Sequence, residues 1–166
     1  MTEHYTKALV LDRENQGDQD SRVFLYCEKL GRISAKVKSA RKITSKLSGH
    51  LEPGNFGNIR LIELGGFQVV DIVSEGLLPR NPKTIAALQL LKEMTVEGDF
   101  DPELWSLISA GHLEIGTILS CLGFSPTFAS CRTCQSGNPG HFLMRELEYS
   151  CHNCLIKAGR PLHFVV

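Results

Sequence analysis

Two C-x2-C motifs near the end of the chain hold the residues best suited to bind a metal ion. Cys131 and Cys134 form the first pair, and Cys151 and Cys154 form the second after sixteen intervening residues. Each turn directs two thiolates to one point, so two such turns complete a tetrahedral site of four sulfurs. The spacing predicts one structural Zn²⁺ in a zinc ribbon. Four protein ligands leave no position for water or substrate, so this zinc would stabilise the fold and take no part in a reaction.

Two other uses of these cysteines are open. Two disulfide bonds are the first, although the N-terminal segment lacks the apolar run that directs secretion. A catalytic zinc is the second, because His112 and Glu114 precede the first cysteine pair as in zinc deaminases. Ser130 replaces the proline of that motif, and the second cysteine pair would have no role. We therefore expect no catalytic residue, and we expect Cys27 and Cys121, which lie in apolar stretches, to be buried thiols.

A second candidate site lies in residues 29–46, which carry seven basic side chains and no acidic one, although the whole chain has a net charge of zero. Residues 32–38 alternate, so Ile33, Ala35 and Val37 are expected inside and the basic side chains outside, about 7 Å apart. That spacing suits the phosphates of a nucleic-acid strand; a solvated charged sheet face is the alternative. The predicted phosphate-binding residues are Lys29, Arg32, Lys36, Lys38, Arg41, Lys42 and Lys46. The aromatic candidates for base stacking, most of them expected in the core, are Tyr5, Phe24, Tyr26, Phe56 and Phe67.

The elements that position these residues fall into three predicted parts of an α+β fold. Residues 1–77 are expected to form an OB-fold β-barrel, with a plain antiparallel sandwich as the alternative. Residues 78–125 form a short helical region, with one helix from Pro82 and a second over residues 101–123. Residues 126–166 form the zinc ribbon and a C-terminal tail. The five predicted strands cover residues 5–11, 22–27, 32–38, 59–64 and 67–74.

Several short segments, in this order and spacing, resemble the RecO family of bacterial DNA repair and recombination mediator proteins. The segments are ALVL at 8–11, GDQD at 17–20, LGRI at 30–33, VKSARK at 37–42, SKL at 45–47, LEP at 51–53 and LGFSP at 122–126. The resemblance covers most of the chain. Two departures are that Ser39 stands where the family usually has glycine, and that family members continue with further helices after the ribbon.

The resemblance implies an N-terminal OB-fold, a helical domain and a zinc ribbon. It also implies binding to single- and double-stranded DNA, strand annealing, and help in loading recombinase onto DNA covered by single-strand-binding protein. The companion mediator RecR and single-strand-binding protein are the implied protein partners. In the family, the surfaces that bind these partners lie on the further helices that follow the ribbon.

We therefore expect a cytoplasmic, nucleoid-associated DNA-binding mediator that is not an enzyme and has no small-molecule substrate. No apolar stretch approaches the ~20 residues that a membrane span needs, and no Walker-type phosphate loop is present. The alternative is a zinc-ribbon adaptor that binds other proteins and does not anneal DNA. The deaminase is the less favoured alternative.

Overall fold

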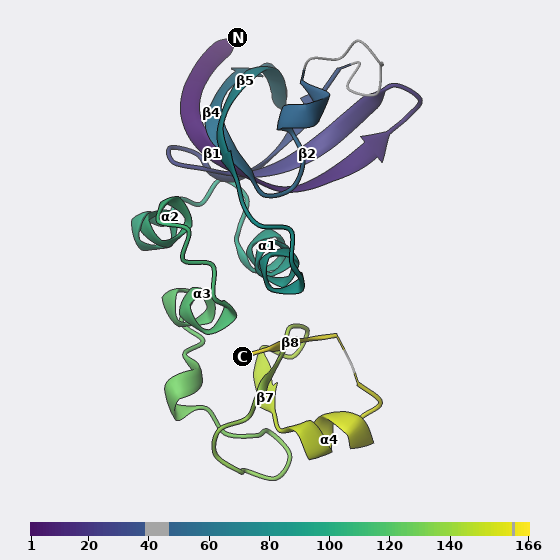
Figure 1. The fold of residues 1–166 in the computed structure, drawn as a ribbon, viewed down its shortest axis with the longest axis vertical. Helices are drawn as coiled ribbons and strands as arrows, with labels where there is room; N and C mark the ends of the chain where they lie inside the picture. Colours follow the sequence, from purple (N-terminus) through teal and green to yellow (C-terminus); the bar gives the residue numbers. More distant parts are fainter. Residues whose placement is uncertain (39–46, 161) are drawn as a thin grey trace. The chain divides into compact units, whose positions relative to one another are not determined.

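The structure is a computed structural model that describes residues 1–38, 47–160 and 162–166. It forms two compact units, residues 1–111 and residues 112–166. A β-barrel with helices α1 and α2 makes up the first unit, and a small sheet with helices α3 and α4 makes up the second (Figure 1). The α+β class is confirmed, and the residues predicted as one helical region are divided between the two units.

Five strands close the barrel of the first unit. They are β1 (Thr2–Gln16), β2 (Asp20–Cys27), β3 (Gly31–Val37), β4 (Asn55–Glu63) and β5 (Phe67–Leu77). Their order is β1-β2-β3-β5-β4, and β4 pairs back with β1. The pairing of β3 with β5 is parallel, whereas the other neighbouring pairs are antiparallel. This is the topology of the predicted OB-fold.

Alternation of buried and more exposed side chains, clearest in β3, shows how the strands enclose an apolar interior. In β3, Ile33, Ala35 and Val37 are at most 1% exposed, whereas Lys36 between them is exposed. Side chains that alternate in this way give a strand one apolar face toward the interior and one outer face. Each fully buried leucine, isoleucine or valine contributes about 1.5–3 kcal/mol to stability. The interior is filled by residues that include Val10, Val23, Leu25, Leu51, Ile59, Leu61, Val69 and Ile72.

Helices α1 (Pro82–Met94) and α2 (Pro102–Ser109) belong to the same unit as the barrel. The Asn81 side chain caps α1 by accepting from the Thr84 N–H, and the predicted cap Asp101 accepts from the first N–H groups of α2. Trp105 of α2 stacks on Tyr26 of β2 and Phe56 of β4, with ring centroids 6.4 and 5.8 Å apart. Part of the outer barrel face is therefore covered by helix.

The predicted single helix over residues 101–123 is wrong. The structure has two helices there, because α2 ends at Ser109 and α3 spans Ile115–Cys121. Gly111 lies between them with a φ of +74°. A residue in this left-handed conformation ends a right-handed helix, so the run of apolar residues is interrupted despite its helical spacing.

The connection between α1 and α2 passes closely over the start of β3. Gly31 has a φ of +63°, and a Cβ atom there would lie 1.9 Å from the Asp99 carbonyl oxygen. Just beside it, the Gly98 N–H donates to the Arg32 carbonyl oxygen at 2.8 Å. Glycine is required at position 31 both by the backbone conformation and by this close approach.

The second unit is organised around a sheet of three short strands. They are β6 (His141–Leu143), β7 (Glu148–Ser150) and β8 (His163–Val165), in the order β7-β6-β8. Phe142 packs against Phe124 and Tyr149, with ring centroids 5.5 and 5.1 Å away. The remaining elements are α4 (His152–Lys157) and the 3-10 turns η1 (Ser48–His50) and η2 (Pro126–Phe128), with η1 in the first unit. None of the helices in the described ranges is long and apolar enough to cross a membrane.

We expect Gly31→Ala to lower the stability of the barrel unit. A non-glycine residue in this conformation costs about 1–3 kcal/mol, before the clash with the Asp99 carbonyl is relieved. Urea unfolding measured by circular dichroism tests this, with Gly17→Ala as the control. Gly17 also has a positive φ, but a Cβ atom there would meet nothing within 4 Å. If both variants lose the same free energy of unfolding, the close approach of Asp99 to Gly31 carries no energetic cost.

Candidate metal centre and nucleic-acid interface

The first cysteine pair lies in a tight turn that folds back on itself. The Cys131 N–H donates to the Ser136 carbonyl at 2.9 Å, and the Gln135 N–H donates to the Cys131 carbonyl at 2.9 Å. Gln135 has a φ of +60°, which reverses the chain after Cys134. The Arg132 N–H donates to the Tyr149 carbonyl at 2.9 Å, so the turn is fixed to β7. The turn that carries the first pair is therefore held in place by backbone hydrogen bonds within itself and to β7.

The second pair lies where β7 ends and α4 begins, with Cys151 as the residue that precedes the helix. The four Sγ atoms of the two pairs all lie within 4.8 Å of one another. Those of Cys134 and Cys151 are 3.7 Å apart. A tetrahedron with metal–sulfur bonds of about 2.3 Å has edges of about 3.8 Å, so this spacing fits a tetrahedral metal site. The four cysteines of these pairs are not joined by disulfide bonds, so the disulfide alternative is not realised in the structure.

Hydrogen bonds prepare part of this cluster for metal binding. Burial opposes ionisation of the Cys131 thiol, but backbone hydrogen bonds from Cys134, Cys151 and Thr133 outweigh it and lower the pKa of Cys131 to about 5. Hydrogen bonding to Ser136 lowers the pKa of Cys134. By contrast, hydrogen bonds with the Cys151 and Cys134 thiols raise the pKa of Cys154 to about 12. The cluster thus combines thiols that ionise readily with one that keeps its proton unless a cation binds.

Neither residue of the deaminase motif lies in the second helix as expected. His112 and Glu114 are exposed and fall in the connection between α2 and α3. Within the described residues, the group able to hold a metal ion consists of the four cysteines. Cys27 is fully buried, and burial raises its pKa to about 12, as expected of an inert thiol. Cys121 is only partly buried, so its predicted burial is wrong.

The predicted basic row is only partly exposed on the barrel. Lys36 and Lys38 are exposed, and Lys36 forms an ion pair with Asp20 at 2.9 Å. Arg32 is partly buried, and its Nε donates to the Thr95 carbonyl at 2.8 Å. The exposed Lys29 donates to the Tyr5 carbonyl at 3.3 Å. The predicted residues Arg41, Lys42 and Lys46 lie outside the described residues.

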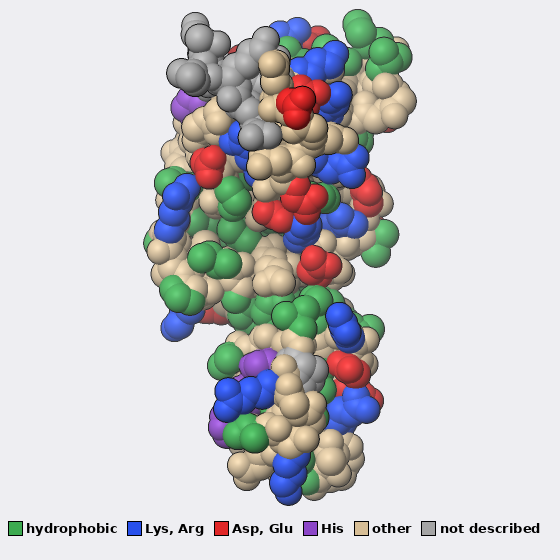
Figure 2. Space-filling view, turned by 90° about the vertical axis from the view of Figure 1, so that its right-hand side faces the viewer, with side chains coloured by type: hydrophobic (Ala, Val, Ile, Leu, Met, Phe, Trp, Pro, Cys, Tyr) green, Lys and Arg blue, Asp and Glu red, His purple; other side chains and the backbone are tan. Residues whose placement is uncertain are grey.

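Sequence reasoning missed one exposed cation on the same face. Arg22 on β2 lies directly opposite Lys36 on β3 in the strand register. The signal was available, because Val23 and Leu25 are buried and alternation therefore places Arg22 outside. It was overlooked because Arg22 precedes the basic stretch in the sequence. Figure 2 shows Lys and Arg side chains interspersed with Asp and Glu on the barrel face that it displays.

Most of the aromatic candidates for base stacking are occupied. Tyr26 and Phe56 pack against Trp105, and Lys92 lies over the Phe24 ring with its Nζ 4.1 Å from the centroid. Phe67 packs against the barrel core. Tyr5 is 61% exposed, and the Arg60 guanidinium lies over its ring, 5.8 Å from the centroid.

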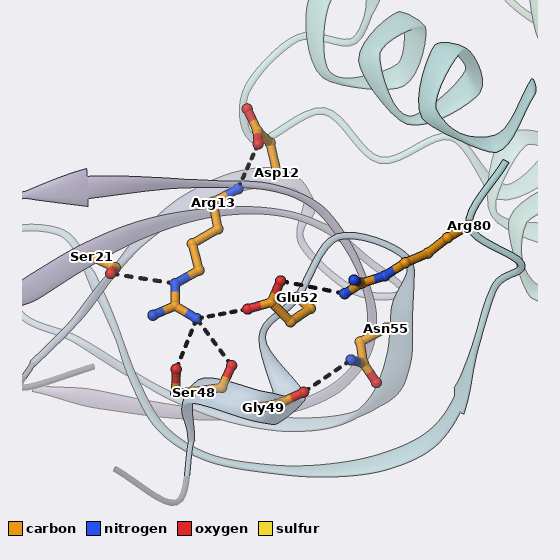
Figure 3. A network of polar contacts seen from close by, with 8 residues as sticks. All are labelled: Asp12, Arg13, Ser21, Ser48, Gly49, Glu52, Asn55 and Arg80. Atoms are coloured by element: carbon orange, nitrogen blue, oxygen red, sulfur yellow. Dashed lines mark hydrogen bonds and ion pairs between the residues drawn. The ribbon is translucent and has the colours of Figure 1, made fainter. Parts of the chain in front are cut away.

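A polar network around Arg13 fixes the segment that leads into β4 (Figure 3). Its Nη1 donates to the Ser48 carbonyl at 3.0 Å, to the Ser48 hydroxyl at 3.1 Å and to Glu52 at 3.3 Å. Its Nε donates to the Ser21 hydroxyl at 3.4 Å, and Arg80 also contacts Glu52. Because these partners use the Arg13 guanidinium and leave its side chain 13% exposed, Arg13 holds the fold together and is not a candidate phosphate ligand.

We expect Cys134→Ser to abolish stoichiometric metal binding. If four ligands share the about 10–16 kcal/mol of apparent binding energy of a structural zinc, one ligand contributes about 3 kcal/mol. Metal content measured by plasma mass spectrometry checks this, with Cys121→Ser as a control in the same unit. Loss of metal from both variants would point to unfolding instead of a lost ligand.

Zinc affinity should fall as the pH is lowered from 7 to 5. Protons compete with the metal for the thiolates, and Cys154, whose pKa is raised, must release its proton on binding. The Cys131 thiolate, with its pKa near 5, is present at pH 7 and becomes protonated as the pH falls through 5. Competition with a chromophoric chelator should show about a tenfold loss per pH unit for each proton released. A pH-independent affinity would contradict coordination by these thiols.

Known proteins provide independent comparisons. Residues 1–75 match the family model described as recombination protein O N terminal. The DNA repair protein RecO of Alkaliphilus metalliredigens is 25% identical in an alignment that covers 90% of this chain and 71% of the relative. The RecO of Myxococcus xanthus is 28% identical, over 80% of this chain and 64% of the relative. The RecO of Syntrophobacter fumaroxidans is 30% identical, over 78% of this chain and 60% of the relative. This chain thus spans 60–71% of the length of these relatives, and its similarity to RecO proteins extends over most of its residues.

Proposed function

We propose that this chain is a DNA-binding mediator of recombinational repair that holds single-stranded DNA on the outer face of β2 and β3. The exposed cations Arg22, Lys36 and Lys38 on that face are the observation that carries the proposal. We define these three residues as the basic face. The OB-fold and the RecO relatives, which are named DNA repair proteins, support the same function.

The basic face suits phosphates better than bases. Arg22 and Lys36 are cross-strand neighbours, and the exposed Lys38 directly follows the last residue of β3, Val37. The ion pair between Lys36 and Asp20 is exposed, so it contributes about 0–1 kcal/mol and a phosphate can displace Asp20. Because Tyr26 and Phe56 are covered, contacts are mainly to phosphates and sequence specificity is low. Lys29, Arg32, Arg41, Lys42 and Lys46 extend this interface in the proposal.

The mechanism requires no catalytic residue, and the protein is not an enzyme. Phosphate contacts screen the repulsion between two strands, and base pairing then provides the free energy of annealing. Double-stranded DNA binds through the same contacts. The protein partners are a RecR-type mediator and single-strand-binding protein. With them, the protein prepares DNA in the cytoplasm for loading of the recombinase. The four cysteines hold one structural Zn²⁺.

A protein-binding adaptor is the second candidate, and one observation favours it. A groove of about 490 Å³ lies between the barrel and α1, lined by apolar side chains such as Leu11, Leu78 and Ile85. Ile85 is 61% exposed and adds an accessible apolar side chain to this groove. In this reading the basic face has no role.

Reversing the charge of Lys36 and Lys38 to glutamate should weaken binding to a labelled single-stranded oligonucleotide. Three to six phosphate contacts predict a slope of log K on log salt concentration of about −2 to −4, and each lost contact should reduce its size by about 0.7. Fluorescence anisotropy at several salt concentrations measures this slope. As a matched control, the single variant Lys38→Glu is compared with Lys83→Glu. Lys83 is exposed on α1 and lies outside the basic face. Equal affinity of the double variant and the unmodified protein would favour the adaptor.

A further inference from the structure

A side chain from outside the barrel occupies the middle of the outer side of β3. The Glu97 carboxylate accepts two hydrogen bonds through its Oε1, one from the Ser34 backbone N–H and one from the Ser34 hydroxyl, both at 3.0 Å. Glu97 belongs to the connection between α1 and α2 and lies 63 residues from Ser34 in the sequence. A negatively charged group is therefore bound within the strand that carries the predicted phosphate ligands.

The edge of β3 leaves this N–H available. The pairing of β3 with β5 covers Ala35 and Lys36, and Ser34 precedes the paired positions. Residues of the connection fill the gap, because Arg32 and Glu97 form a parallel β-bridge and the Gly98 N–H donates to the Arg32 carbonyl. If the pairing with β5 extended to Ser34, its N–H would donate to a backbone carbonyl. Here it donates to the Glu97 carboxylate instead.

The surroundings of Ser34 favour an anion. Arg32 and Lys36 precede and follow it on the same side of β3, each about 7 Å away along the strand. An N–H, an O–H and two flanking cations are the groups that bind a phosphate oxygen in proteins. Glu97 supplies an oxygen of the same charge and the same hydrogen-bonding capacity.

We propose that Ser34 is a phosphate subsite of the basic face, and that Glu97 occupies it until a nucleic-acid phosphate replaces the carboxylate. This inference rests on the proposed function. Glu97 is exposed, so its side chain can swing into solvent without unpacking the core. Two acidic side chains therefore compete with DNA for groups on β3. Glu97 binds Ser34, and Asp20 binds Lys36. A polyanion that makes several contacts at once overcomes both competitors, whereas a single phosphate group does not.

The test compares Glu97→Gln with Glu103→Gln in binding to a labelled 20-nucleotide oligothymidylate. Glutamine keeps an acceptor oxygen for Ser34, so the connection stays in place while the charge is removed. Glu103 is exposed on α2, and its substitution changes the net charge equally. We expect Glu97→Gln to bind about three- to tenfold more tightly at low salt, and Glu103→Gln to stay within about twofold of the unmodified protein.

A second readout follows the Ser34 amide directly. Adding the oligonucleotide to the unmodified protein should shift the Ser34 amide signal in nitrogen–proton correlation spectra, because phosphate replaces the carboxylate. Salt-dependent binding with equal affinities for the unmodified protein and both variants, or equal gains in both variants, would overturn the inference and leave the proposed function intact. Absence of binding by all three proteins would overturn the proposed function and this inference with it.

Discussion

Each side chain on a barrel strand can point only inward or outward, and the rest of this structure depends on that constraint. The inward positions are filled by aliphatic residues that fix the register of all five strands. The outward positions are then divided between two uses. Trp105 covers the outer barrel surface around Tyr26 and Phe56. The outer surface of β2 and β3 that carries Arg22 and Lys36 stays accessible. The position of the basic face is thus a consequence of how the core is packed.

Local patterns predicted the parts of the molecule that depend on local geometry. The alternation at 32–38 gave the inside and outside of β3 correctly, and the two C-x2-C motifs predicted a cluster of four thiols that the structure brings together. Asp101 was recognisable as a helix cap because capping involves only the next few residues. The match of the first 75 residues to a family model agrees with the barrel.

The features that sequence reasoning missed depend on contacts between distant residues. The contact of Glu97 with Ser34 spans 63 positions, and no periodic signal links the two. The same connection half-buries Arg32, which the sequence analysis treated as an exposed cation. The break at Gly111 was hidden because apolar residues on both sides keep a helical spacing. A pattern shows which side of an element is apolar, but it does not show which other segment will cover the polar side.

The six cysteines differ in what an oxidant can reach. Oxidation requires an accessible thiolate, and Cys27 is fully buried with its pKa raised to about 12. Cys134 is exposed, and hydrogen bonding to Ser136 lowers its pKa, so without a bound metal its thiolate is open to solvent. A metal ion bound by the four sulfurs would use the electron pairs that peroxide attacks. Metal binding would therefore protect the most accessible thiolate of the cluster, whereas Cys27 on the barrel strands is protected by burial alone.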